Sequence, residues 1–464
     1  MSQSVIVIGG GPAGYAAAIY CAQLGSQVTL VEQAKLGGTC LNAGCIPTKV
    51  FVQAANLYSQ LNGMKSYGIS IDGEVNVDFS KTAKMKNRIV KQLTQGVGYL
   101  VKKAGVEVIN GYGRLKDAHT VEISIGGSSS ERTADYIILA CGSSEVVIPG
   151  LEPDGVSILN STQMLDITAL PESLCIIGGG VIGVEFATIL SRFGRKVTIV
   201  EMTPTILPLE DEEVSAGLTE ILRSNGVEVL TSTSASGIVS KDETGATLAL
   251  KDAEGNVTEK RFEKVLVCVG RKPNLTSIGL DEVGIEYNRK FIETNNKMQT
   301  NVPNIFAIGD LTASPQLAHV GYYEAKIAAL NIAGKEVLTD YTAIPSCVFS
   351  HPEISRVGMT EKMARECYGD DVQAKVVPFS GNGKALIEQE AEGFIKAVYL
   401  GADHKLLGMT VFGPKAAELI TEPTLAIKEK LTIDSIADTI HAHPSVSEVL
   451  NEVAAAACGL SLHS

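Results

Sequence analysis

Two segments of this chain share the same order of apolar and polar positions. Residues 5 to 32 start with the apolar run VIVI, pass through GGGPAG, continue at helical spacing and end in the β-branched run QVTLVE. Residues 174 to 201 repeat this order, and 11 of the 28 aligned positions are identical. Since strands are marked by short β-branched runs and helices by a period near 3.6, each segment is predicted to be a βαβ unit.

The glycines of each unit indicate what it binds. They have the spacing GxGxxG and are Gly9, Gly11 and Gly14 in the first unit and Gly178, Gly180 and Gly183 in the second. The first glycine of each set permits a tight turn, the second lets backbone approach a pyrophosphate, and the third lets helix pack on strand. Glu32 and Glu201 each follow the last glycine by 18 residues, where a carboxylate can bind a ribose diol. One copy could be an ordinary glycine-rich turn, but two complete copies predict two dinucleotide sites.

The residues after each terminal glutamate distinguish the two nucleotides. A carboxylate at Glu201 repels a 2′-phosphate, and the following residues, MTPTILP, contain no arginine to receive one. The second unit is therefore predicted to bind NAD, and the first suits the adenosine end of FAD.

Further patterns organise the rest of the chain. Apolar strands ending in glycine are expected at residues 136 to 143 and 264 to 274, a helix at 81 to 103 and a hairpin at IGGSSSE, while strands followed by helices from about residue 344 suggest an α+β domain. The predicted fold class is α/β, with two Rossmann-like dinucleotide-binding domains and a C-terminal α+β domain. The expected segments are 1–148 for FAD and the two clustered cysteines, 149–271 for NAD, 272–343 completing the FAD site, and 344–464 at the C-terminus.

Composition narrows the possible partners and the compartment. The 464 residues carry a net charge of −13 without a basic block, which argues against nucleic acid and anionic membranes. No run approaches the roughly 20 apolar residues of a membrane span, and the N-terminus lacks the positive charge of a signal peptide. Nine mostly isolated cysteines fit a reducing compartment, so a cytoplasmic protein is expected.

Two cysteines are exceptional because they lie close together, in GGTCLNAGCIPTKV. A disulfide between Cys40 and Cys45 closes too short a loop to restrict the unfolded chain much. A zinc half-site needs a second ligand pair, for which HAH at 441 to 443 is the only clustered option, and no metal is assigned. Two inert buried thiols remain possible. A redox pair has positive support, because Pro47 predicts a helix start that places Cys45 at the positive helix end, with Lys49 one turn later.

Several motifs together resemble one family. GGTCLNAGCIPTK resembles the redox-active segment of the flavoprotein disulfide reductases, the paired GGGxxG units match that family's FAD and NAD sites, and IFAIGD with QLAH resembles its second FAD motif. HAHPSVSE near the C-terminus completes the set, and the order of motifs matches over nearly the whole chain.

The resemblance implies specific roles. Cys40 is the thiol that exchanges with a dithiol substrate, Cys45 faces the flavin, and Lys49 pairs with Glu185 near it. The further residues that it places at FAD are Gly38, Thr39, Gly113, Gly142, Ser143, Asp310, Ala318 and His319, and Gly270 is placed at NAD. It also implies FAD and NAD as cofactors, a homodimer, and a lipoyl-bearing protein as the partner that presents the dithiol.

The C-terminal motif has two interpretations. SVSE is a capping-box sequence, so Glu448 could simply start the last helix from Ser445. The functional alternative is that Glu448 orients His443 as a general base. In the resembled family this histidine serves the disulfide of the other subunit, whereas His441 has no evident partner and is taken as structural. The remaining enzyme alternatives are an NADPH-dependent disulfide reductase or a diaphorase, and the non-enzymatic one is an NADH-binding sensor.

Overall fold

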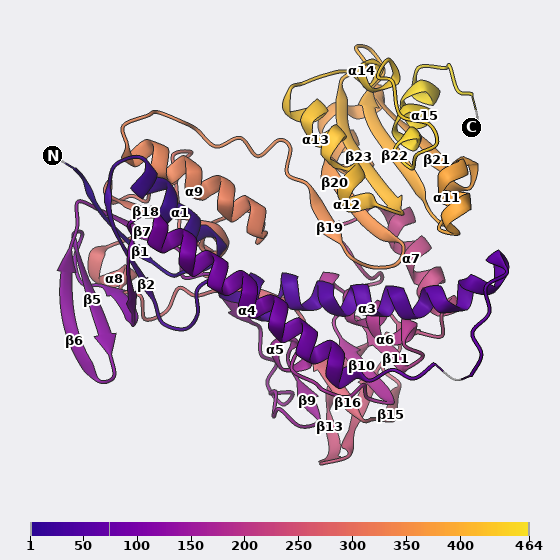
Figure 1. The fold of residues 1–464 in the computed structure, drawn as a ribbon, viewed down its shortest axis with the longest axis horizontal. Coiled ribbons are helices and arrows are strands. Elements are labelled where there is room, and N and C mark those ends of the chain that lie inside the picture. Colours follow the sequence, from indigo (N-terminus) through magenta and orange to yellow (C-terminus); the bar gives the residue numbers. More distant parts are fainter. Residues whose placement is uncertain (1, 74, 463–464) are drawn as a thin grey trace.

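The structure is a computed structural model that describes residues 2–73 and 75–462. Figure 1 shows three parts: an N-terminal part around β1, a central part around β10 and a C-terminal part around β22 and β23. Two long antiparallel helices, α3 (Cys45–Gly63) and α4 (Phe79–Lys103), run from the first part along the second. Two parallel sheets and one antiparallel sheet with helices confirm the predicted α/β class with a C-terminal α+β unit.

The first part is built on a five-stranded parallel sheet of order β18-β7-β1-β2-β3. Its strands are β1 (Ser4–Ile8), β2 (Gln27–Glu32), β3 (Glu107–Asn110), β7 (Tyr136–Leu139) and β18 (Ile305–Ala307). Helices α1 (Pro12–Gln23) and α9 (Ala318–Ile332) pack against each other. The strands β4 (Tyr112–Leu115), β5 (Thr120–Ile125) and β6 (Ser128–Thr133) form a separate antiparallel sheet. The chain thus returns to its first sheet after completing the second.

The second part repeats this plan with the parallel order β12-β11-β10-β16-β9. Its elements are β9 (Ile158–Leu159), α5 (Ser161–Met164), β10 (Ser173–Ile177), α6 (Val181–Arg192), β11 (Lys196–Val200), α7 (Glu212–Ser224), β12 (Glu228–Leu230) and β16 (Lys264–Val267). An antiparallel meander, β13 (Ser234–Asp242), β14 (Gly245–Lys251) and β15 (Val257–Phe262), was not foreseen from the sequence. The short pair β8 (Ser143–Glu145) and β17 (Arg271–Pro273) links the two parts, and α8 spans Leu280–Val283.

The C-terminal part is a five-stranded antiparallel sheet of order β19-β20-β23-β22-β21 with helices. The strands are β19 (Ser346–Val348), β20 (Glu353–Gly358), β21 (Val372–Pro378), β22 (Phe394–Leu400) and β23 (Leu406–Gly413). The helices are α10 (Glu361–Tyr368), α11 (Gly383–Glu388), α12 (Ala416–Leu419), α13 (Thr421–Lys428), α14 (Ile433–Ala437) and α15 (Glu448–Ala457). Within the described ranges, no helix is both long and apolar enough to cross a membrane.

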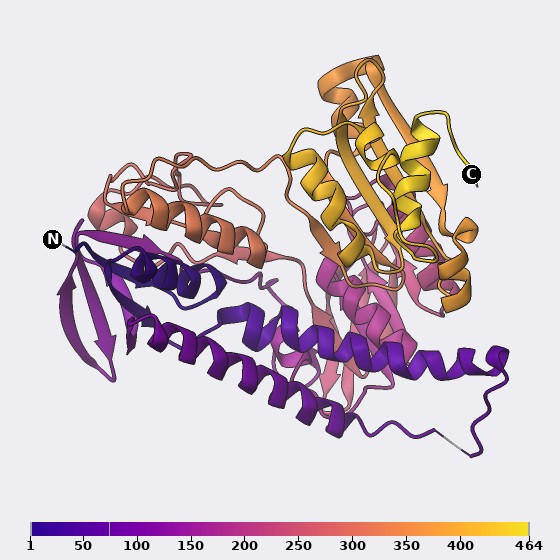
Figure 2. The ribbon, with the colours of Figure 1, turned by 45° about the horizontal axis from the view of Figure 1, so that its top comes forward.

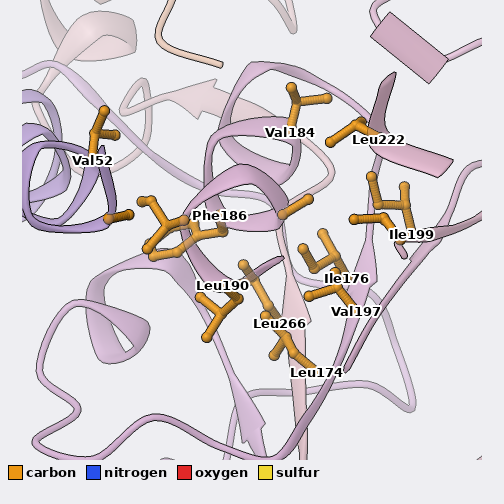
Figure 3. Packing of buried hydrophobic residues seen from close by; sticks show 14 of the residues in the cluster. Val52, Leu174, Ile176, Val184, Phe186, Leu190, Val197, Ile199, Leu222 and Leu266 are labelled. Carbon is orange, nitrogen blue, oxygen red and sulfur yellow. The ribbon is translucent and has the colours of Figure 1, made fainter. Parts of the chain in front are cut away.

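Helix α3 is fixed to the second part by a shared core. Figure 3 shows Val52 of α3 approaching Phe186 of α6, beside Leu190. Phe51 and Phe79 add an aromatic contact between α3 and α4, with ring centroids 4.9 Å apart. Burying two phenylalanines of this kind stabilises the contact by several kcal/mol, on a scale of about 1.5–3 kcal/mol for each side chain. This packing sets the position of the two cysteines relative to α6.

Candidate active site

One cavity of about 1980 Å³ connects both glycine loops with the two cysteines. The residues assigned from the sequence that line it are Gly9, Gly11, Glu32, Gly38, Thr39, Cys40, Cys45, Lys49, Gly113, Gly142, Ser143, Gly178, Gly180, Glu185, Glu201, Gly270, Asp310, Ala318 and His319. Gly14 and Gly183 lie beneath it in the helix–strand contacts. His443 and Glu448 do not line the cavity of their own chain.

The glycine loops are shaped by contacts that exclude side chains. A Cβ on Gly14 would lie 1.7 Å from the carbonyl oxygen of Gly9, and one on Gly183 would lie 2.0 Å from that of Gly178. Helices α1 and α6 therefore begin directly against the ends of β1 and β10. No side chain caps either helix N-terminus, and neither first turn contains an acid, so the free N–H groups suit phosphate groups.

Glu32 and Glu201 make equivalent contacts in the two units. Glu32 accepts hydrogen bonds from the Gly10 N–H at 2.5 Å and the Ala34 N–H at 2.7 Å. Glu201 accepts from the Gly179 N–H and the Thr203 N–H, both at 2.7 Å. Each carboxylate thus stabilises its loop and keeps lone pairs available for a ribose diol. The internal repeat read from the sequence extends to individual hydrogen bonds.

Arg271, which lines the cavity, and Glu324, which is buried next to it, were not singled out from the sequence. Ser143 donates to Asp310, and Arg271 Nε donates to Ser143 Oγ at 2.8 Å. The buried Glu324 accepts from the Gly309 N–H at 2.6 Å and so fixes the turn that carries Asp310. Residues that meet only through the fold form no recognisable short motif, so the sequence does not reveal these contacts. Together with the uncapped N-terminus of α1, they provide polar groups along the part of the cavity where FAD is expected.

Cys40 and Cys45 are adjacent thiols at a helix junction. Cys40 lies in α2 (Gly38–Ala43) and Cys45 is the first residue of α3, which confirms the predicted helix start. The hydrogen bond from the Cys40 thiol, opposed by burial and aided by the charge of Lys49, lowers the pKa of Cys45 to about 7. The same shared proton, together with burial, raises the pKa of Cys40. In the dithiol form Cys45 is therefore the thiolate and Cys40 the thiol.

An ion pair between the partly exposed Lys49 and the buried Glu185 holds a positive charge next to these thiols. Lys49 donates to both oxygens of Glu185 at 2.9 and 3.0 Å, and the Glu185 side chain is only 5% exposed. The Phe349 N–H donates to the same carboxylate at 3.1 Å, and the Lys49 ammonium lies 4.4 Å from the centre of the Phe349 ring. Three parts of the chain thus fix the lysine beside Cys45, whose thiolate it stabilises.

We expect a pH-dependent thiolate at Cys45. In enzyme reduced with a small dithiol and then freed of it, the Cys45 thiolate is present above about pH 7 and is lost below it. The alkylation rate of Cys45, followed by peptide mass spectrometry, should rise with a midpoint near that value. Lys49→Met should move the midpoint upward by at least about one pH unit, the usual effect of removing an adjacent opposite charge. Lys65→Met, on an exposed site, is the matched control, and an equal shift in both variants would contradict the assignment.

His443 and Glu448 form a pair outside the cavity. His443 Nδ1 donates to Glu448 Oε1 at 2.8 Å, and the Ser445 N–H donates to Glu448 Oε2 at 2.8 Å. Although burial raises the pKa of Glu448, these hydrogen bonds hold it below its ordinary value. Because α15 begins only at Glu448, the predicted capping box is not formed, although the bond back to Ser445 exists. The histidine side chain is 82% exposed in the single chain.

Two other pairs were missed by the sequence analysis. His441, taken as lacking a partner, faces Glu422 Oε2 at 3.2 Å and the Thr439 carbonyl at 2.9 Å. Tyr15 and Tyr322 share a hydrogen bond of 2.7 Å, and Tyr322 lines the cavity. Burial, the bond to Tyr15 and the negative charge of the cysteines raise the pKa of Tyr322. The tyrosines are 307 positions apart, so no sequence pattern indicated their pairing.

Family comparisons cover nearly the whole chain. Residues 3–325 match the family described as pyridine nucleotide-disulphide oxidoreductase, and residues 344–454 match the dimerisation domain of that family. The first match covers both glycine loops and both clustered cysteines. The second covers His443 and Glu448.

Individual relatives are similar over their full lengths. The chain is 40% identical over 461 residues to a dihydrolipoyl dehydrogenase of Bacillus subtilis, covering 99% of this chain and 100% of that protein. It is 41% identical over 459 residues to a dihydrolipoyl dehydrogenase of Geobacillus stearothermophilus, covering 99% and 97%. Among solved structures, LpdA from Mycobacterium tuberculosis has a TM-score of 0.90 at 27% identity, covering 97% of this chain and 99% of that one. The flavoprotein disulfide reductase RclA from Escherichia coli has a TM-score of 0.86 at 29% identity, covering 97% and 99%.

Proposed function

The chain belongs to the pyridine nucleotide-disulphide oxidoreductase family, and from this premise we propose that it catalyses the dihydrolipoyl dehydrogenase reaction. Protein-bound dihydrolipoamide is oxidised to lipoamide while NAD is reduced to NADH. The observation that carries the proposal is the Cys40/Cys45 pair, with Lys49 and Glu185, inside one cavity between two dinucleotide loops. The enzyme acts as a cytoplasmic homodimer and receives its substrate from a lipoyl-bearing protein of a 2-oxo acid dehydrogenase or glycine cleavage complex.

Each of the four segments of the chain has its own role in binding or assembly. Residues 1–148 and 272–343 hold FAD, residues 149–271 hold NAD, and residues 344–464 form the dimer contact. Bound FAD would supply the two-electron relay between the reduced cysteine pair and NAD. The glycine loops, Glu32 and Glu201 orient the nucleotides, while Asp310 and Ser143 bind the central part of FAD.

The cysteines carry out the exchange with substrate. One substrate thiolate attacks the Cys40 sulfur of the Cys40–Cys45 disulfide, forming a mixed disulfide and releasing Cys45 as a thiolate. The second substrate thiolate then attacks the substrate sulfur of this mixed disulfide, which closes the lipoamide ring and releases Cys40. Two electrons and two protons leave the substrate. Lys49 stabilises the Cys45 thiolate, and His443 of the other subunit, oriented by Glu448, takes up a proton.

The direct test uses the purified holoenzyme with dihydrolipoamide and NAD. NADH formation that depends on dihydrolipoamide supports the proposal. An enzyme that is reduced by NADH but ignores dihydrolipoamide is instead a diaphorase or a sensor. An enzyme that requires NADP is another disulfide reductase of the family.

We expect a strong preference for NAD over NADP. The Glu201 carboxylate should disfavour the 2′-phosphate by at least about 100-fold in kcat/KM, because unpaired like charges in a binding site cost several kcal/mol. Glu201→Gln should reduce this preference by about tenfold or more. Glu32→Gln is the matched control, since it alters the same hydrogen-bond pattern at the other loop and should leave the NAD/NADP ratio unchanged. An unchanged ratio in Glu201→Gln would remove the electrostatic explanation.

A further inference from the structure

Three side chains that can bind a metal meet in the C-terminal part, far from the cysteine pair in sequence. His404 lies in the turn between β22 and β23, Asp434 lies in the first turn of α14, and Cys458 directly follows α15. Helices α14 and α15 pack against each other (Figure 1). His404 Nδ1, an Asp434 carboxylate oxygen and Cys458 Sγ all lie within 4.8 Å of one another. This histidine–aspartate–cysteine cluster has no part in the proposed reaction.

We propose that the histidine–aspartate–cysteine cluster binds a zinc ion, with a fourth coordination position open to water. The inference does not rest on the proposed function. Imidazole, carboxylate and thiolate groups are all ordinary zinc ligands. Magnesium and calcium prefer oxygen ligands alone, so the nitrogen and sulfur atoms of this cluster favour zinc. The two negative ligands neutralise the dication.

The distances between the ligand atoms suit this geometry. His404 Nδ1 lies 2.9 Å from Asp434 Oδ1, and Cys458 Sγ lies 3.4 Å from the same oxygen. With zinc–ligand bonds of 2.0–2.3 Å at tetrahedral angles, such pairs are separated by about 3.3 and about 3.5 Å. For these two pairs, shifts of a few tenths of an ångström are sufficient. His404 Nδ1 and Cys458 Sγ, which lie within 4.8 Å of each other, must come to about 3.5 Å. In the metal-free arrangement the imidazole N–H and the thiol S–H both point at one oxygen, and the ion takes the place of these protons.

A plain ion pair between His404 and Asp434 explains the positions of the three side chains less completely than a zinc site does. A histidine–aspartate pair at 38% and 44% exposure contributes little to stability, because solvent screens it. It does not account for a cysteine directed at the same carboxylate. The thiol also lies at the negative C-terminal end of α15. A cation is therefore favoured at this position.

The backbone holds the ligands in place without the ion. His404 adopts a left-handed conformation, with φ of +58°, and its N–H donates to the Leu400 carbonyl at 3.0 Å. The Ile433 N–H donates to the His404 carbonyl at 2.8 Å, which ties the turn to α14. The Tyr399 ring packs edge-on against the imidazole, with centroids 6.1 Å apart, and its hydroxyl donates to the Ala457 carbonyl at 3.3 Å. The cluster is thus largely preorganised.

Bound zinc would join the β22–β23 turn, α14 and the end of α15. Because Glu448 is the first residue of α15, the ion clamps the helix that carries the partner of His443. The ligands are separated by 30 and 24 positions along the chain, so they form none of the short spacings by which zinc sites are recognised in a sequence.

The test measures zinc binding to the holoenzyme with its Cys40–Cys45 disulfide oxidised, since the reduced pair could itself bind zinc. Equilibrium dialysis with zinc alone should give one ion per chain with a dissociation constant below about 10 µM. Asp434→Asn, His404→Gln and Cys458→Ser should each weaken binding by at least about 100-fold. X-ray absorption at the zinc edge should show one sulfur neighbour, and zinc should raise the melting temperature of the wild type but not that of the three ligand variants.

The matched control is the double variant Cys367→Ser, Asp370→Asn, which removes a thiol and a carboxylate from an exposed part of the same domain. It should bind zinc like the wild type. Binding that survives in all three ligand variants, or zinc without a sulfur neighbour, would overturn the proposal, as would a wild type that binds less than one equivalent. Asp434→Asn preserves size and shape, so its loss of binding can be separated from misfolding by far-ultraviolet circular dichroism and retained NAD-dependent activity.

Discussion

Replacing Cys40 with serine is expected to lower the rate of dihydrolipoamide oxidation by at least about 10⁴-fold, because no sulfur remains at the position where the mixed disulfide forms. Cys40 is the thiol of the pair, and Cys45 is the thiolate stabilised by Lys49, so the two sulfurs cannot exchange roles without moving that charge. The measurement is NADH formation from dihydrolipoamide and NAD. The loss should appear in kcat, since a serine leaves the cavity shape nearly unchanged.

A second enzymatic activity shows whether Cys40→Ser loses only the dithiol exchange or also the structure of its nucleotide sites. Reduction of an artificial electron acceptor by NADH needs both dinucleotide sites but no disulfide, so it should remain in Cys40→Ser. Cys367→Ser, which alters an exposed thiol on α10, should retain both activities. Substantial dihydrolipoamide oxidation by Cys40→Ser would refute the proposed exchange. Loss of both activities would instead indicate a disturbed FAD site.

The parts of this site that follow from the sequence are those determined by local chain geometry. The GxGxxG loops need glycine because helix and strand nearly touch, so Gly14 and Gly183 reveal the contact without any structure. The placement of Cys45 at a helix start follows from Pro47 three residues into that helix. Such features depend on residues that are close together in the chain, so short sequence motifs predict them.

The parts that do not follow depend on packing between distant segments. The family resemblance paired Lys49 with Glu185, but the contribution of Phe349 depends on the C-terminal part lying against α3. The pairing of His441 with Glu422 was missed because it requires the position of α13. The capping-box interpretation placed the start of the last helix at Val446, two residues before its observed start at Glu448, whose N-cap is Ser447. Local patterns give element types reliably and side-chain partners only where those partners are near in sequence.

Replacing His443 with glutamine is expected to lower the rate of dihydrolipoamide oxidation by about 10³-fold, within the range typical for loss of a general base. Its Nδ1 is occupied by Glu448, so Nε2 is the nitrogen available to accept a proton. Glu448→Gln should cause a smaller loss, because the amide can still orient the ring but no longer stabilises its protonated form. Pre-steady-state reduction of the enzyme by dihydrolipoamide is the step to measure.

His441 provides the matched control. Its two ring nitrogens lie 2.9 Å from the Thr439 carbonyl oxygen and 3.2 Å from Glu422 Oε2, and its side chain is only 6% exposed. It is bound too firmly to act on a substrate. His441→Gln should therefore reduce stability while changing the rate of reduction by less than about tenfold, and equal losses in the two histidine variants would contradict the assignment of the base.

Mixed dimers test whether His443 serves the other subunit, as its exposure and its absence from the cavity of its own chain imply. Chains carrying Cys40→Ser and chains carrying His443→Gln form inactive homodimers. A dimer with one chain of each kind has one site that lacks both groups and one site that retains both, if the histidine acts across the contact. Co-expressed and doubly affinity-purified mixed dimers should then recover about half of the wild-type rate. If the histidine acts within its own chain, every site in the mixed dimer lacks one group and no activity returns.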